Sequence, residues 1–162
     1  MGRLPSRREL WTHYIAGDGR QSRAQFSAKV ASYSGDGIPL MGTILGIDPS
    51  LRGTGMVVIK REKAEDFVLK FSDVIDLHSF KGDMSACLCK IFEQLQVVID
   101  QYRPDGVALE QAIYVQNVKI AQVMGAVKGV ILMAIRLKNL EVKEYPPLRV
   151  KQAISGYGRA NK

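Results

Sequence analysis

The chain has 162 residues, of which 46% are hydrophobic and 24% are charged, and its formal net charge is +7. This length allows one well-buried core but is short for two, so we expect a single folded domain. The longest apolar run covers only residues 130–135, far below the roughly 20 residues that span a bilayer, which argues against a membrane protein and favours a soluble, cytoplasmic one.

Residues 1–40 are rich in arginine and serine and have no sustained apolar period. This composition predicts a disordered basic extension, with a start of translation at Met41 after an upstream misreading, a basic arm and a targeting leader as the alternatives. Met41 stands directly before the first apolar strand pattern, so the folded domain is predicted over residues 41–162.

Alternating and continuous apolar runs after Met41 predict strands at 43–48, about 55–61 and about 66–76, arranged as an antiparallel meander. Apolar residues then recur at helical spacing from Leu88 to Tyr102. The residues at 103–106, Arg-Pro-Asp-Gly, end this helix before a strand that finishes at Glu110.

The C-terminal third continues the alternation of helices and strands. Asn117 can cap a second long helix that runs to about Lys138, and a strand follows near 141–145. Two prolines at 146 and 147 begin a short helix through about Ile154. Three strands, a helix, a strand, a helix and a strand are an α/β order, which predicts a mixed sheet of antiparallel and parallel strands flanked by helices.

Two of the predicted strands are apolar and end in a carboxylate, Asp48 in one and Glu110 in the other. A carboxylate at the end of a buried strand is costly unless it is paired, and two such groups side by side are stabilised by a divalent cation. Residues 111–162 hold nine Lys and Arg against two Glu. A basic region beside an acidic metal site favours a phosphodiester substrate and metal-assisted phosphoryl transfer, with a merely solubilising surface as the alternative.

Four separate motifs support this interpretation and occur in a fixed order. They follow the Asp48 turn at 46–55 and are Ala-Leu-Glu-Gln at 108–111, Gln-Asn-Val-Lys at 116–119, Gly-Ala-Val-Lys-Gly at 125–129 and the segment from Glu144 to Ala153. In order and spacing, from about Ile44 to Lys162, the chain resembles the RuvC family of crossover junction endodeoxyribonucleases.

The resemblance implies a ribonuclease H-like domain that forms a homodimer, holds a four-way (Holliday) DNA junction and makes paired, symmetric nicks in recombination and repair. It implies two Mg²⁺ ions in the complete site, with Mn²⁺ as a substitute, and a branch-migration helicase complex as a partner. Asp48 and Glu110 match the first two metal-binding carboxylates of the family and are the predicted catalytic residues.

The resemblance also implies positions that contact DNA. Lys151 and Lys162 match two basic positions near the scissile phosphate, Lys128 lies on a helix that faces DNA, and Tyr114 can stack on an exposed base. The predicted DNA-binding set is Tyr114, Asn117, Lys128, Arg149, Lys151, Arg159 and Lys162. For each lysine taken alone the alternative is a solvated surface charge, and for Tyr114 it is ordinary packing.

Ala121, Gly125 and Gly129 recur at every fourth residue and leave a flat strip on the second long helix. Such a strip allows another backbone to approach closely. The family uses this helix in its dimer interface, so these residues are the predicted contact. Close packing on the protein's own sheet is the alternative, and the two are not exclusive.

The sequence departs from the family at its C-terminal end. The family completes its metal site with an acidic pair on a further helix, beyond the position that matches Lys162, whereas no Asp or Glu follows Glu144 here. We therefore expect a domain that lacks its last helix and full activity. A fragment, a frameshifted product and a shortened junction-binding protein all stay open.

Two functions of other classes compete with the nuclease. One is a noncatalytic module that binds DNA junctions, and the other is a ribonuclease H-like nuclease that acts on structured RNA. Binding in EDTA without nicking distinguishes the first, and competition between junction DNA and an RNA duplex distinguishes the second.

Overall fold

The computed structural model describes residues 41–63, 66–80, 82–111 and 117–155. The described elements, in chain order, are β1 (Gly42–Asp48), β2 (Gly53–Lys63), β3 (Asp66–Asp76), α3 (Met84–Tyr102), β4 (Gly106–Glu110), α4 (Val118–Arg136), β5 (Val142–Tyr145) and α5 (Pro147–Ser155). The predicted order is confirmed, although β2 begins earlier and α4 ends earlier than the sequence indicates. The predicted basic extension at 1–40 lies outside the described residues.

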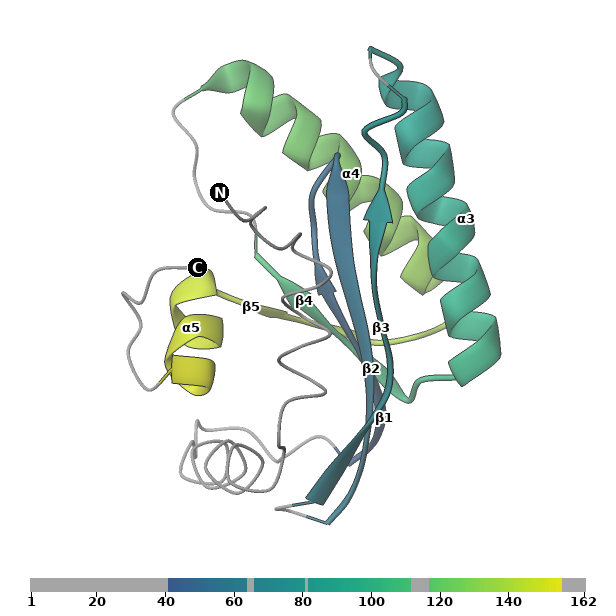
Figure 1. Ribbon diagram of the computed structural model, residues 1–162, viewed down its shortest axis with the longest axis vertical. Coiled ribbons are helices and arrows are strands. Elements are labelled where there is room, and N and C mark those ends of the chain that lie inside the picture. The colour runs from purple at the N-terminus through teal and green to yellow at the C-terminus, as the bar shows by residue number, and fades with distance from the viewer. Residues whose placement is uncertain (1–40, 64–65, 81, 112–116, 156–162) are drawn as a thin grey trace, which may run out of the picture.

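The five strands form one mixed sheet in the order β3-β2-β1-β4-β5 (Figure 1). The pairs β1–β2 and β2–β3 are antiparallel, as short connections between consecutive strands allow. The pairs β1–β4 and β4–β5 are parallel, and the chain crosses over through α3 and α4 to make them. The predicted combination of a meander with parallel strands is therefore confirmed.

Short polar side chains and one left-handed residue fix the ends of the long helices. Asp83 caps α3 by accepting a hydrogen bond of 2.8 Å from the backbone N–H of Ala86. Arg103 then ends this helix in the left-handed conformation, with φ at 45°. Asn117 caps α4 as predicted, because its side-chain oxygen accepts from the N–H groups of Lys119 and Ile120.

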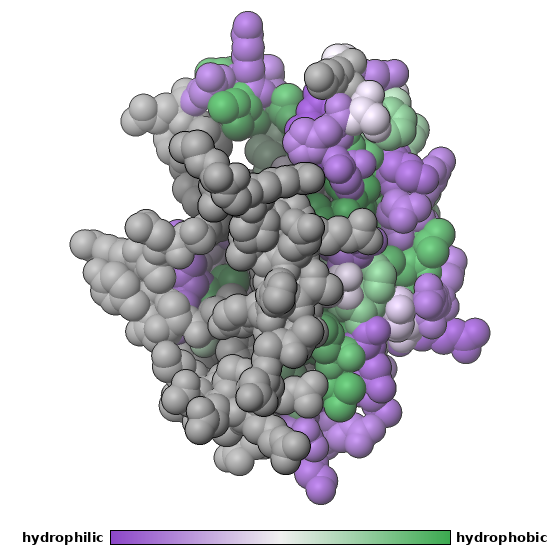
Figure 2. Space-filling model, viewed as in Figure 1, coloured by the Kyte–Doolittle hydropathy of each residue, from purple (hydrophilic) through white to green (hydrophobic). Residues whose placement is uncertain are grey.

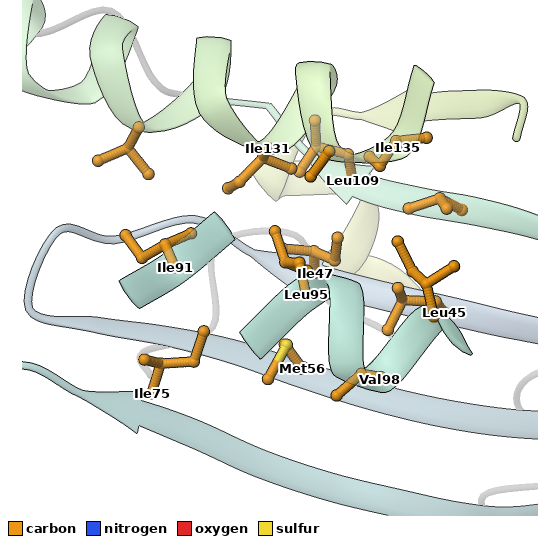
Figure 3. Close-up of a cluster of buried hydrophobic side chains, with 14 of the residues drawn as sticks. Leu45, Ile47, Met56, Ile75, Ile91, Leu95, Val98, Leu109, Ile131 and Ile135 are labelled. Carbon is orange, nitrogen blue, oxygen red and sulfur yellow. The ribbon is translucent and has the colours of Figure 1, made fainter. Parts of the chain in front are cut away.

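The hydrophobic core lies between the sheet and the helices α3 and α4 (Figure 3). Leu45 and Ile47 of β1 point into it, together with Leu95 of α3 and Ile131 of α4. Side chains of a strand alternate between its two faces, so Asp48 lies on the face of the sheet opposite this core. Helix α5 is on the side of the sheet opposite α3 (Figure 1).

Among the described helices, α4 alone is long and apolar enough to cross a bilayer by length and composition. One of its faces is part of the core, where Val127, Ile131, Ala134 and Ile135 are buried. A core helix of a globular domain meets the same criterion, but only 22% of this apolar window is buried, so packing accounts for one face of α4 and leaves other apolar residues of the helix exposed.

Candidate metal site and nucleic-acid interface

The structure brings Asp48 and Glu110 to the same end of two neighbouring strands. Ile47 of β1 pairs in parallel register with Leu109 of β4, and the two carboxylates are the next residues along each strand. Ile47 and Leu109 both belong to the core. Because successive side chains alternate, Asp48 and Glu110 share the opposite face of the sheet.

The residues on either side of this pair continue the same row across the sheet. Gly55 of β2 pairs with Asp48, and Tyr145 of β5 pairs with Glu110. Asp48 is exposed and Glu110 is half-buried. Across the described parts of the chain, no group of three or more His, Cys, Asp or Glu side chains is placed to hold a metal ion. The described site therefore offers two carboxylates.

A hydrogen-bonded turn connects Asp48 to β2. The hydroxyl of the fully buried Thr54 donates to the carbonyl oxygen of Ser50 at 2.5 Å and accepts from the N–H of Ser50 at 3.2 Å. These bonds close the turn from within. The turn therefore has a defined shape, which limits where the end of β1 can lie.

The opposite ends of the same two strands are also joined. The N–H of Thr43 donates to Oδ2 of Asp105 at 2.7 Å, and the N–H of Asp105 donates to the carbonyl oxygen of Thr43 at 2.7 Å. Asp105 directly precedes β4, and Thr43 is the second residue of β1. This exchange fixes the register that brings Asp48 beside Glu110 at the other end.

Helix α5 starts at the sheet end that carries the carboxylates. Tyr145 is the register partner of Glu110, and α5 begins at Pro147. The helix carries the predicted DNA contacts Arg149, which is exposed, and Lys151, which is half-buried. Lys143 lies on the same face of β5 as Tyr145, with its Nζ 5.8 Å from the centre of the tyrosine ring. It is a further cation near the site that the motifs did not single out.

Lys128 is engaged within the protein. Its Nζ lies 2.7 Å from Oε2 of Glu144, and the two side chains are only 34% and 27% exposed. The pair links α4 to β5. A DNA phosphate at this position would have to compete with Glu144 for the ammonium group.

The strip of small residues on α4 faces outward. Ala121, Gly125 and Gly129 are exposed, and a Cβ atom added at either glycine would meet nothing within 4 Å. Large apolar residues on the same helix are also exposed, among them Val118 (68%) and Met133 (51%). Figure 2 shows hydrophobic surface at the start of α4. The alternative that this strip packs on the protein's own sheet is therefore wrong, because the core uses the other side of the helix.

A second acidic residue of the meander lies at the same sheet end. Asp76 pairs with Gly53 at the end of β3 and accepts a hydrogen bond of 3.0 Å from the N–H of His78. Two hydrogen bonds hold the pKa of Asp76 below its usual value: the backbone bond has the larger effect, and the bond to the His78 ring at 2.6 Å has the smaller one. Asp76 is strongly exposed and is engaged with His78.

Three predicted DNA-binding residues, Tyr114, Arg159 and Lys162, lie outside the described residues. Asn117 is exposed, but its side-chain oxygen is used in capping α4. Of the predicted DNA-binding set, Asn117, Lys128, Arg149 and Lys151 can be located.

Comparison with known proteins places this geometry in a family. A family model described as Crossover junction endodeoxyribonuclease RuvC matches residues 44–162. The chain belongs to the RuvC family. The RuvC of Caldicellulosiruptor saccharolyticus is 38% identical over 120 residues, which cover 74% of this chain and 71% of that protein. The RuvC of Petrotoga mobilis is 39% identical over 119 residues, covering 74% and 72%.

Solved structures agree with this assignment. RuvC of T. thermophilus in complex with a Holliday junction substrate is 26% identical with a TM-score of 0.67, over 75% of this chain and 73% of that one. The yeast mitochondrial Holliday junction resolvase Ydc2 is 11% identical with a TM-score of 0.55, over 84% and 61%, and shows the shared fold alone. The predicted ribonuclease H-like fold is confirmed, and membership of the RuvC family implies a divalent-metal-dependent nuclease.

The RuvC motifs pointed to Asp48 but not to the residues that hold its turn. Arg52 and Thr54 lie within the Asp48 motif, and the structure gives each of them specific hydrogen bonds. Thr54 gave a signal in the sequence, because a polar residue near the start of a buried strand usually has a hydrogen-bond partner. The Arg52 contacts are with residues far along the chain and leave no local signal.

Proposed function

We propose that this RuvC-family chain resolves four-way DNA junctions by hydrolysing phosphodiester bonds with Asp48 and Glu110 as its catalytic carboxylates. The observation that carries the proposal is their position at the ends of two adjacent parallel strands, on one face of the sheet. The junction substrate is supported by the solved RuvC complex with a Holliday junction. The cellular process is recombination and repair, in the cytoplasm.

The donor set fits a hard divalent cation. Carboxylate oxygens are the ligands that Mg²⁺ prefers, and Mg²⁺ is commonly held by one or two carboxylates together with waters and substrate phosphate. Asp48 and Glu110 would hold this ion, and Mn²⁺ would substitute because it takes the same ligands. When bound, the cation would supply charge stabilisation and an activated water for in-line displacement at phosphorus.

The residues of the chain provide binding and orientation around that site. We propose that Arg149 and Lys151, with Lys143 as an addition, contact phosphates next to the carboxylates. Lys128 belongs to the DNA-binding set by family resemblance, but its ion pair with Glu144 favours a role in orienting α4 on β5. Asn117, Tyr114, Arg159 and Lys162 complete the proposed interface.

Paired nicks on two strands require two sites, so we propose a homodimer with twofold symmetry. The exposed strip of Ala121, Gly125 and Gly129 supports a close helix-to-helix contact there. A branch-migration helicase complex is the proposed larger assembly, and it rests on family resemblance alone.

The test uses end-labelled four-way junction DNA with the chain and its Asp48→Asn and Glu110→Gln variants, in Mg²⁺, Mn²⁺ or EDTA. We expect symmetric, metal-dependent nicks confined to the junction, and a loss of roughly a hundredfold or more in each variant, since metal ligation contributes several kcal/mol. Asp66→Asn is the matched control, because Asp66 begins β3 at the opposite end of the sheet, where it pairs with Lys63. A linear duplex tests shape selectivity.

A noncatalytic junction-binding module is the second candidate, favoured by the finding that the described residues group only two carboxylates at the site. It predicts junction binding in EDTA and no nick in either metal. Nicks that Asp48→Asn leaves unchanged would contradict the assigned carboxylates. Preferential cleavage of an RNA duplex would identify structured RNA, rather than a DNA junction, as the substrate.

A further inference from the structure

Arg52 lies in the turn that follows Asp48, and its side chain reaches the segment between β3 and α3. Its Nη1 is 2.9 Å from the carbonyl oxygen of Phe80, 3.2 Å from that of Leu77 and 3.6 Å from Sγ of Cys87. A single guanidinium nitrogen therefore meets three acceptors. All of them lie 25 or more residues away along the chain.

The segment that receives these bonds is firmly held. Leu77 and Cys87 are fully buried, and the Cys87 thiol also donates to the carbonyl oxygen of Phe80 at 3.7 Å. The N–H of Leu77 donates back to the carbonyl oxygen of Arg52 at 3.3 Å. Arg52 is thus tied by both its side chain and its backbone to a part of the molecule that is fixed by the core.

The turn itself transmits this anchorage toward Asp48. The N–H of Arg52 donates to Oγ of Ser50 at 3.4 Å, and Ser50 is bonded through its backbone to Thr54. Only Pro49 separates Ser50 from Asp48. The hydrogen bonds therefore connect the start of α3 through Arg52 to Ser50, which is two residues after Asp48.

We infer that Arg52 is a positioning residue for Asp48, which fixes the turn after β1 against the start of α3 and so holds the carboxylate in one place beside Glu110. The inference rests on the proposed function, in which Asp48 binds the cation. Arginine suits the task because its planar group donates in several directions from one fixed plane, whereas a lysine ammonium is a point charge on a flexible stem.

The test measures the affinity of the whole chain for Mn²⁺ in the absence of DNA. The electron paramagnetic resonance signal of the free ion reports how much Mn²⁺ is unbound. Arg52→Gln should weaken Mn²⁺ binding by roughly tenfold, the lower range for residues that orient metal ligands, and Arg52→Lys should weaken it less. Junction affinity in EDTA should stay unchanged, since Arg52 is occupied inside the protein.

Two control variants separate positioning from general loss of stability. Arg61→Gln removes an arginine whose Nε donates to a backbone carbonyl, that of Lys63, at the far end of β2. Val58→Ala lowers stability from a fully buried core position of the same strand without touching the turn. Both should retain the Mn²⁺ affinity of the unaltered chain. If Val58→Ala and Arg52→Gln weaken Mn²⁺ binding equally, the effect is loss of stability and the inference fails.

Asp48→Asn provides the reference. If it leaves Mn²⁺ binding unchanged, the proposed metal site is wrong, independently of Arg52. If Asp48→Asn weakens binding while Arg52→Gln does not, the metal site stands and the positioning role is overturned. Weakened binding in both, with the two controls unaffected, supports the inference.

Discussion

Thr43 and Asp105 exchange two hydrogen bonds of 2.7 Å at the beginnings of the two strands whose ends carry Asp48 and Glu110. A slip of one residue in a strand moves every side chain to the other face of the sheet. The bonds at one end of β1 and β4 thus ensure that both carboxylates reach the same face at the other end. The register is supported from a point well removed from the site.

Asp105→Ala should destabilise the domain, because it removes the acceptor of the Thr43 N–H. A hydrogen bond to a charged group contributes about 1.5–3 kcal/mol when buried, and this bond is exposed, so we expect about 1 kcal/mol in urea unfolding. Asp73→Ala is the control, since the side chain of Asp73 accepts from its own neighbour in the chain, Val74. Equal losses for the two variants would contradict a specific role for the Thr43 pair.

Thr54→Val should lower the free energy of unfolding by more than Asp105→Ala does. The hydroxyl of Thr54 is fully buried and serves both the N–H and the carbonyl oxygen of Ser50, so its removal leaves two backbone groups without their partner. The expected loss of unfolding free energy is about 1–3 kcal/mol. Because the same turn follows Asp48, nicking of the junction should fall further than stability accounts for.

Thr43→Val is the matched control for that variant. Thr43 makes its hydrogen bonds to Asp105 through the backbone, which the substitution retains. Its stability and nicking rate should remain near those of the unaltered chain. A Thr54→Val variant that unfolds at the same urea concentration as Thr43→Val would show that the hydroxyl does not hold the turn.

The order of strands and helices could be predicted from the sequence because it depends on local patterns. The apolar runs that end in Asp48 and Glu110 and the cap at Asn117 are all visible within a few residues. The contact of Lys128 with Glu144 was not visible, because it depends on how α4 lies over β5. The direction of the Gly125 strip was equally open, since helical spacing defines a face of α4 but not whether that face meets the core.

Lys128 and Glu144 should behave as a coupled pair in a double-mutant cycle of Lys128→Met and Glu144→Gln. Their side chains are about one-third exposed, so the coupling energy in urea unfolding should be about 0.2–1 kcal/mol. A coupling of zero would mean that the ion pair does not contribute to stability.

The salt dependence of junction binding tests whether Lys128 contacts DNA directly. Removing one lysine that neutralises a phosphate makes the slope of log K against log salt shallower by about 0.9. Lys151→Met should show such a change because Lys151 lies on α5, which starts at the sheet end that carries the carboxylates. Lys128→Met should leave the slope unaltered, because the Lys128 ammonium forms a partly buried ion pair with Glu144 across α4 and β5. A shallower slope for Lys128→Met would mean that DNA displaces Glu144 and that this lysine reaches a phosphate.

Substitutions at Gly125 and Gly129 can distinguish an effect on the stability of the monomer from an effect on the association of two chains. An added Cβ at either position meets nothing within 4 Å. Gly→Ala at each position should therefore stabilise the isolated domain by about 0.5–1 kcal/mol, since glycine is unfavourable inside a helix. Leucine at the same positions should leave the monomer folded but keep a second backbone from approaching α4. Sedimentation equilibrium should then show self-association weakened by roughly tenfold or more, the effect of losing about 1.4 kcal/mol of association energy.

Gln101→Leu controls for the added apolar surface in that experiment, because Gln101 is an exposed residue of α3 rather than α4. It should leave the dimerisation constant unchanged. If the leucine variants at 125 and 129 associate as tightly as the unaltered chain, the strip is not the dimer contact.

The exposed apolar residues Val118 and Met133 extend along the same helix, so their replacement by serine should also weaken association without affecting the core. Loss of paired nicks together with loss of the dimer, while single nicks persist, would connect the symmetry of the assembly to the symmetry of cleavage.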